Sequence, residues 1–190
     1  SGNDRRRLLV AGLGFALLVA APLAGAELRV GTGTGCTYAT IADAVAAAVA
    51  NGTTNDQLLV KGNGHTIPAP IVLNLSAAGT VEIIGGYANC TDAVPTVANS
   101  SLSAPSSAAF TLQNPGAGSR TFTLRNVDLI AGAGAGRLLD VTGRILVNID
   151  RTLLSNGSSA DGANIRMAGP NVVLLLLNDS KIYSGEATGN

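Results

Sequence analysis

The sequence LRNVDLIAG, at residues 124–132, recurs in two altered copies: IDRTLLSNG at residues 149–157 and LNDSKIYSG at residues 177–185. The copies align on a terminal glycine, and these glycines are 25 and 28 residues apart. They are Gly132, Gly157 and Gly185. A period of this length with one strand-like unit per repeat is typical of solenoids, whose coils bury apolar side chains against one another. The repeat therefore predicts an all-β solenoid with turns at the three glycines.

Two columns of the alignment hold only aliphatic residues. The first column contains Leu124, Ile149 and Leu177, and the second contains Leu129, Leu154 and Ile182. Residues that recur in register in this way predict stacked core positions, one above the other in successive coils.

The composition limits both the size of the protein and the kind of partner. At 190 residues the chain is long enough for one domain with a core of its own. Its formal net charge is zero, only 13% of its residues are charged, and no basic stripe is present, so a nucleic-acid partner is not expected. The 24 glycines and many short apolar runs favour a β protein with frequent tight turns.

The first 26 residues have the three parts of a secretory signal peptide. Arg5, Arg6 and Arg7 are the basic start, residues 8–21 are apolar, and Ala24-Gly25-Ala26 is a cleavage site of small residues. The sequence thus predicts an exported protein, on the cell surface, in the medium or in the periplasm, whose mature chain starts near Glu27. The alternative is a retained N-terminal anchor, although the apolar run is short for a bilayer span.

The two cysteines, Cys36 and Cys90, both follow the predicted cleavage site. An even number of cysteines in an exported protein favours one disulfide, which here would close a loop of more than 50 residues. Two free, buried thiols are the alternative. His65 is the only histidine and no CxxC pair exists, so we expect neither a metal site nor a cofactor.

The mature chain divides into an N-terminal cap at residues 27–56 and coils at residues 57–190. Residues 27–30 predict a short strand, and residues 40–50 predict a helix with Thr40 as N-cap and Asp43 three positions on. Such a helix can cover the open end of a stack of coils. Residues 92–107 are rich in Pro, Ala and Ser and predict an irregular excursion. The strands predicted in the coils are 58–61, 71–75, 81–84, 110–112, 121–130, 137–141, 144–149, 163–167 and 172–177.

Four motifs resemble a known group of proteins: VGTGTGCTYATIADAV at residues 30–45, VEIIGGYANC at 81–90, SNGSSADGANI at 155–165 and LNDSKIYSGEATGN at 177–190. The chain from Glu27 onward is similar to bacterial exported right-handed parallel β-helix proteins of the polymorphic-outer-membrane-protein and autotransporter-passenger type. The resemblance implies a right-handed β-helix of the pectate-lyase-like fold. The glycine pair of that type's turn is degenerate in residues 162–165, and a turn of that kind should follow Asn190. We therefore expect a fragment, or a protein with an open C-terminal end.

Because related β-helices include polysaccharide lyases and hydrolases, the carboxylates must be weighed as catalytic groups. When positions are counted back from the repeat glycines, Arg125 aligns with Asp150, and Arg151 aligns with Asp179. In stacked coils the members of each pair would therefore lie one above the other. Each acid then neighbours a base on the next coil, an arrangement that stabilises a sheet by about 0.2–1 kcal/mol per pair. We interpret these four residues as structural, and we assign no catalytic residue.

Other candidates are isolated. Asp128, Asp140 and Asp161 have no repeated partner in the sequence, and we expect His65 in a surface loop. Carbohydrate binding normally uses exposed aromatic side chains. After the predicted signal peptide the aromatic residues are Tyr38, Tyr87, Tyr183, Phe110 and Phe122, and the phenylalanines lie on aliphatic strands.

The resulting hypothesis is a non-catalytic exported β-helix protein that acts as a stalk or as an adhesin-like passenger. We expect it to bind a host or cell-surface glycan or protein, and to self-associate through its open end. The alternative is a polysaccharide lyase or glycoside hydrolase of the pectate-lyase-like fold.

Overall fold

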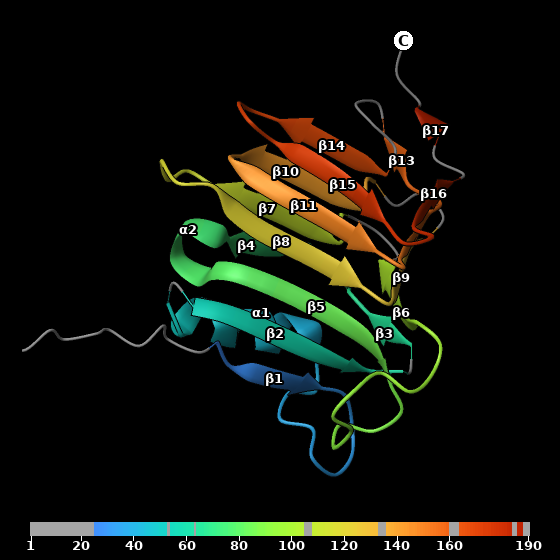
Figure 1. Ribbon diagram of the computed structural model, residues 1–190. Coiled ribbons are helices and arrows are strands. Elements are labelled where there is room, and N and C mark those ends of the chain that lie inside the picture. Colours follow the sequence, from blue (N-terminus) through green and yellow to red (C-terminus); the bar gives the residue numbers. More distant parts are fainter. Residues whose placement is uncertain are drawn as a thin grey trace, which may run out of the picture.

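The structure is a computed structural model, and it describes residues 25–52, 54–62, 64–104, 108–132, 136–159, 164–183 and 186–187. The described strands pair only in parallel and form three long sheets, which we name A, B and C (Figure 1). Sheet A contains, in spatial order, β1 (Glu27–Val30), β2 (Thr54–Lys61), β5 (Gly79–Tyr87), β8 (Arg120–Arg125), β11 (Ile145–Asp150) and β15 (Val173–Leu177).

Sheets B and C complete the coils. Sheet B contains β3 (His65–Thr66), β6 (Ser100–Ala104), β9 (Val127–Ala131), β12 (Leu153–Ser155) and β16 (Lys181–Tyr183). Sheet C contains β4 (Ile71–Asn74), β7 (Phe110–Asn114), β10 (Leu139–Gly143) and β14 (Ile165–Ala168). A further pair joins β13 (Ser158–Ser159) to β17 (Glu186–Ala187), and the helices are α1 (Ile41–Ala50) and α2 (Leu75–Ala78).

In each of the four coils that begin with β2, β5, β8 and β11, the chain visits sheets A, B and C in the same order. In Figure 1 it crosses the front in sheet A, turns into sheet B, returns behind in sheet C and then rises to the next coil. This is a right-handed path, the hand that parallel crossovers adopt in nearly all proteins. The predicted fold, a right-handed parallel β-helix with a short N-terminal helix, is confirmed.

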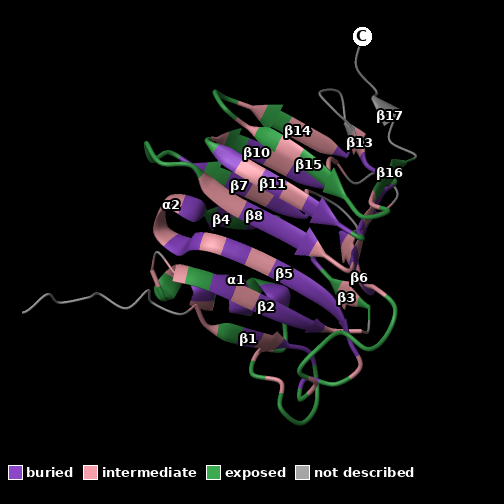
Figure 2. Ribbon diagram, viewed as in Figure 1, coloured by how far each residue is buried: buried purple, intermediate pink, exposed green. Residues whose placement is uncertain are grey.

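The core consists of columns of apolar side chains that run through the stack. One column on sheet A joins Ile83, Leu124 and Ile149, which are paired in register and fully buried. Phe110 and Phe122 bring sheets C and A together, with ring centroids 5.6 Å apart and planes tilted by 52°. Figure 2 shows the buried residues concentrated along the strands of the middle coils.

The second predicted core column is confirmed. The first predicted core column is wrong at its last member, which is off by one residue. Leu129, Leu154 and Ile182 are aligned in sheet B. In sheet A, however, Ile149 is opposite Leu176, and Leu177 is opposite Asp150. The extra residue is taken up in the turn, where both Asn178 and Asp179 have left-handed backbone.

Several short elements were not predicted. The predicted strand 121–130 is two strands, β8 and β9, because the backbone turns a corner at Asn126 with φ of 52°. The predicted excursion 92–107 contains a full coil strand, β6, whose small residues Ser100 to Ala104 lack the aliphatic pattern of the other strands. The prediction of an irregular segment there was wrong for residues 100–104.

The helix α1 lies at the N-terminal end of the stack and covers the first coils. The Thr40 side chain accepts a hydrogen bond from the Asp43 backbone N–H at 3.1 Å, which is the predicted N-cap. Ile41, Ala44, Val45 and Ala48 form its buried face against the core. The helix thereby shields apolar side chains that a bare end of the stack would expose to water.

The predicted disulfide is present, and it joins the loop before α1 to the loop after β5. Cys36 and Cys90 are bonded at a sequence separation of 54. The Arg29 guanidinium reinforces the same region, since it donates to the backbone carbonyls of Cys90 and Asp92. The cap is therefore linked to the second full coil both covalently and by hydrogen bonds.

We expect reduction of this disulfide to lower the free energy of unfolding by about 4 kcal/mol, because the bond removes loop-closure entropy from the unfolded chain. Urea unfolding with and without reductant measures the loss. The C36S/C90S double variant is the control and should unfold at the reduced midpoint in both conditions. A midpoint that reductant does not move in the unmodified protein would show that the bond contributes nothing to stability.

Candidate functional site

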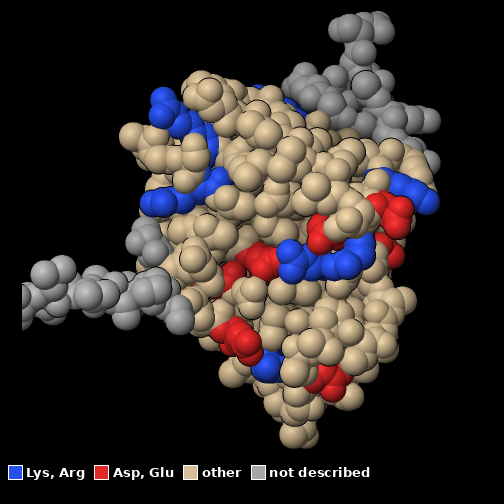
Figure 3. Space-filling model, viewed as in Figure 1, with Lys and Arg blue, Asp and Glu red and all other residues tan. Residues whose placement is uncertain are grey.

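The charged residues of sheet A form a ladder on its outer surface. Arg125 lies between two acids of neighbouring coils, with Nη2 2.9 Å from Glu82 Oε1 and Nε 3.0 Å from Asp150 Oδ2. Gln57 extends the ladder by donating to Glu82 at 2.9 Å. In Figure 3 acidic and basic side chains gather in a band across the middle of this face, and further charged side chains lie at its upper left and below the band. Of the four residues predicted to stack, Arg125 and Asp150 are thus brought together.

The other predicted pair is arranged differently. Arg151 Nη2 lies 3.6 Å from Asp150 Oδ2, and its Nε donates to Asn126 Oδ1 at 2.9 Å. This ion pair and this hydrogen bond therefore turn the Arg151 side chain toward its own coil and the preceding one. The acid–base contact that the sequence predicted with Asp179 is not among them, because the extra residue of the last turn shifts the register.

A tight corner between sheets A and B recurs in three coils, after β8, β11 and β15, and it depends on unusual backbone. Asn126, Arg151 and Asn178 all have positive φ, at 52°, 46° and 42°. Asparagine adopts this left-handed conformation more readily than other non-glycine residues. Arginine does not, so Arg151 is the unexpected residue of the series. Holding such a residue in this region costs about 1–3 kcal/mol.

A shallow hollow of about 240 Å³ lies at this corner on the outer surface. Among the described residues it is lined by Asn99, Arg151, Thr152, Leu153, Asp179, Lys181 and Tyr183. Lys181 and Tyr183 alternate with the core-column residue Ile182 on β16, so both side chains point outward. The repeat singles out Arg151 and Asp179 but does not connect them with Lys181 or Tyr183, because no sequence motif marks a site made from two turns and a strand.

The isolated acids of the sequence have structural partners. Asp140 pairs with Arg137 on its own coil at 3.1 Å and with Arg166 on the next coil at 3.3 Å. Asp128 accepts a hydrogen bond from Asn99 Nδ2 at 2.8 Å. Asp161 lies outside the described residues. Asp140, which has no repeated partner in the sequence, therefore has a basic partner on the next coil.

The remaining predicted residues also have local contacts. His65 is half-buried on β3, where its Nε2 lies 2.9 Å from the Lys61 carbonyl and so donates to it. The Gly132 N–H donates to Ala104 O at 3.0 Å, and the Gly157 N–H donates to Asn164 Oδ1 at 2.9 Å. Gly185 lies outside the described residues.

Tyr87 belongs to a small apolar cluster with Leu59 and Ile84 on the outside of sheet A. Burial raises the pKa of its hydroxyl, and the nearby Glu27 carboxylate raises this pKa further, while Arg29 lowers it. The tyrosine is therefore held in its neutral form and acts as a packing residue beside the disulfide.

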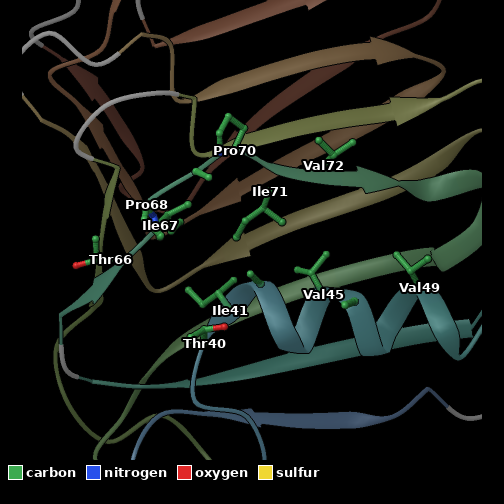
Figure 4. A pocket seen from close by; sticks show the side chains of 13 residues that line it. Thr40, Ile41, Val45, Val49, Thr66, Ile67, Pro68, Pro70, Ile71 and Val72 are labelled. Atoms are coloured by element: carbon green, nitrogen blue, oxygen red, sulfur yellow. The ribbon is translucent and has the colours of Figure 1, made fainter.

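A larger hollow of about 610 Å³ lies between α1 and the segment that leads into β4 (Figure 4). Its described lining is apolar apart from two threonines, Thr40 and Thr66, and it includes Val45, Ile71 and Val72. None of these side chains titrates, so they cannot transfer protons in acid–base catalysis.

Within the described residues no group of three or more His, Cys, Asp and Glu side chains is placed to hold a metal ion. No helix of that part of the chain is long and apolar enough to span a membrane. Comparison of the chain with family models, with curated proteins and with solved structures gives no match in any of the three.

The ladder predicts a measurable coupling between Arg125 and Asp150. In a double-mutant cycle with R125M and D150N, we expect a coupling free energy of about 0.5–1 kcal/mol, because the pair is partly exposed and solvent screens it. Urea unfolding of the four proteins measures it. The same cycle with Arg125 and Asp128, which are not paired, is the control. Equal coupling in both cycles would contradict the ladder.

Proposed function

We propose that this chain is part of a non-catalytic exported β-helix protein, which serves as a rigid stalk or an adhesin-like passenger at the cell surface. The observation that carries the proposal is that the carboxylates of the sheets are bound to arginines. Glu82 and Asp150 are both bound to Arg125, and Asp140 is bound to two arginines. Carboxylates held in this way stabilise neighbouring coils against each other and are poorly placed to act on a substrate.

The shape of the stack supports the same function. Long parallel sheets in which each coil contacts only its neighbours give an extended and regular surface. The outer side chains of sheet A, such as Thr123 and Asn148, form cross-coil contacts of their own, with Asn148 Nδ2 3.4 Å from Thr123 Oγ1. A surface built in this way can present ligand-binding groups at fixed spacing without an enclosed active site. Export rests on the signal-peptide pattern of residues 1–26.

The rival function, a polysaccharide lyase or glycoside hydrolase, needs carboxylates that bind calcium or act as an acid–base pair. We expect the protein to release no unsaturated or reducing ends from a panel of uronic-acid polymers, with or without calcium. A β-helical pectate lyase serves as the positive control for each polymer. Product formation that disappears in D150N or D179N would overturn the proposed function.

The last coil has an apolar edge, for which we propose a second copy of the chain as the partner. Leu175 and Leu177 point outward from β15, and Leu176, at a core position, is 49% exposed because no described strand lies beyond it. Edge strands are normally protected by charges or proline, and β15 contains neither. A strand of this kind can pair antiparallel with its own copy across a two-fold axis.

This partner predicts a dimer that depends on protein concentration. We expect sedimentation velocity to show the dimer for the unmodified chain and a monomer for the L175K/L177K variant, since lysine at an edge opposes strand pairing. The V72K variant introduces a lysine at an exposed apolar position of β4 and should still dimerise. A monomer at every concentration of the unmodified chain would contradict the proposed partner.

A further inference from the structure

The corner hollow next to β16 has the chemistry of a small binding site. Its walls combine two cationic side chains, Arg151 and Lys181, with an exposed aromatic ring, Tyr183, and a carboxylate, Asp179. Tyr183 is 48% exposed, whereas Phe110 and Phe122 are fully buried. The hollow thus contains an exposed aromatic side chain of the kind that carbohydrate binding normally uses.

The left-handed backbone of Arg151 costs conformational free energy, and the packing of the corner does not explain why an arginine stands there. The equivalent turn residues of the neighbouring coils are Asn126 and Asn178, which suit the left-handed backbone. Arginine at this position is strained, and strain of this kind is concentrated at functional sites. Its side chain gives the hollow a guanidinium that an asparagine could not supply.

The backbone of Arg151 is also held firmly. Asn99, which arrives from the end of the excursion, donates from Nδ2 to the Arg151 carbonyl at 2.8 Å and to Asp128 at 2.8 Å. Asn126 Oδ1 accepts from Arg151 Nε at 2.9 Å. Arginine has five N–H donors, so these contacts and the one with Asp150 leave donors on the guanidinium for a ligand.

Lys181 makes no ion pair with any described residue, and it points outward beside Tyr183. The lining of the hollow therefore has two cations and one acid. Lys181 has no ion pair among the described residues and Arg151 shares the Asp150 carboxylate with Arg125, so both cations can still contact an anionic ligand. Guanidinium and ammonium groups bind carboxylates through charge-assisted hydrogen bonds. Tyr183 can pack against an apolar ring face, and Asp179 can accept hydrogen bonds from hydroxyl groups.

From this combination we infer that the corner hollow binds a carboxylated sugar, with the carboxylate on Arg151 and Lys181, the ring on Tyr183 and hydroxyl groups on Asp179. Its volume of about 240 Å³ is below the roughly 300–1,000 Å³ of pockets for drug-sized ligands, so it takes a single ring. This inference deepens the proposed adhesin-like function and rests on it. The chemistry is shared by sialic and uronic acids.

The test is calorimetric titration of the L175K/L177K variant, in which association at β15 cannot cover Tyr183. The probes are two matched pairs, sialyllactose against lactose and cellobiouronic acid against cellobiose, and they differ by the acidic group. We expect an acidic probe to bind and its neutral counterpart not to bind, with affinity falling as salt screens the charges. The pair whose acidic member binds shows whether the ligand is a sialic acid or a uronic acid.

Variants assign the binding to the hollow. On this background R151N should lower the affinity about tenfold, the cost of losing a hydrogen bond to a charged group. K181Q and Y183A should also weaken binding. The matched control is R144N, because Arg144 precedes β11 and Arg151 follows it, at opposite ends of one strand. Since asparagine suits the backbone of residue 151, R151N should unfold at an equal or higher urea concentration, which separates lost binding from lost folding.

Three results would overturn the inference: no binding of either acidic probe, equal binding of acidic and neutral probes, or equal affinity of R151N and R144N. Binding of hexaglutamate as tight as that of the acidic sugar would also overturn it and would indicate a site for acidic peptides. Analysis of the probes after titration distinguishes this inference from the proposed function. A probe that is bound and cleaved refutes the non-catalytic function but leaves the sugar site, whereas a failure to bind refutes the site alone.

Discussion

In-register parallel stacking of one coil on the next is the constraint on which the rest of this structure depends. Because most strands of neighbouring coils pair residue by residue, side chains lie above their counterparts, and apolar positions become continuous columns such as Ile83, Leu124 and Ile149. The same register places Arg125 between Glu82 and Asp150. A shift of one residue would turn core side chains outward and would separate the charges. Core packing and surface electrostatics are therefore set together.

The register also explains why the corner between sheets A and B is so distinctive. In the coils of β8, β11 and β15 the chain changes direction there without breaking the ladders on either side, and left-handed backbone at Asn126, Arg151 and Asn178 achieves this. Hydroxyl side chains then bind the carbonyls of the turn: Thr152 Oγ1 donates to Asp150 O at 3.0 Å, and Ser180 Oγ donates to Ile149 O at 2.8 Å. A rigid corner presents its outward side chains at fixed positions. This rigidity is the property that the proposed sugar site requires.

The two ends of the described stack differ in how they meet solvent. At the N-terminal end α1, the disulfide and Arg29 cover and fasten the first coils. At the other end β15 and β16 expose apolar residues that include Leu176 and Ile182. Burial requires each coil to have a neighbour on both sides, so the helix replaces the neighbour at one end, and a second copy is the partner proposed at the other.

The sequence by itself determined the fold class, the capping helix and the pairing of Cys36 with Cys90. These features depend on local signals: a repeat, an N-cap pattern and an even count of cysteines in a chain whose sequence predicts export. The short strands β6 and β16 were not predicted. In segments of only three to five residues, two or three polar residues make the two-residue alternation of a strand unrecognisable. The alignment on glycines also placed Leu177 where the structure has Leu176, since spacing cannot show how many residues a turn consumes. Only the tertiary structure decided which charges meet and which residues share the corner hollow. Asn99, Arg151 and Tyr183 come from an excursion, a turn and a strand, and only the stacking of coils brings them together.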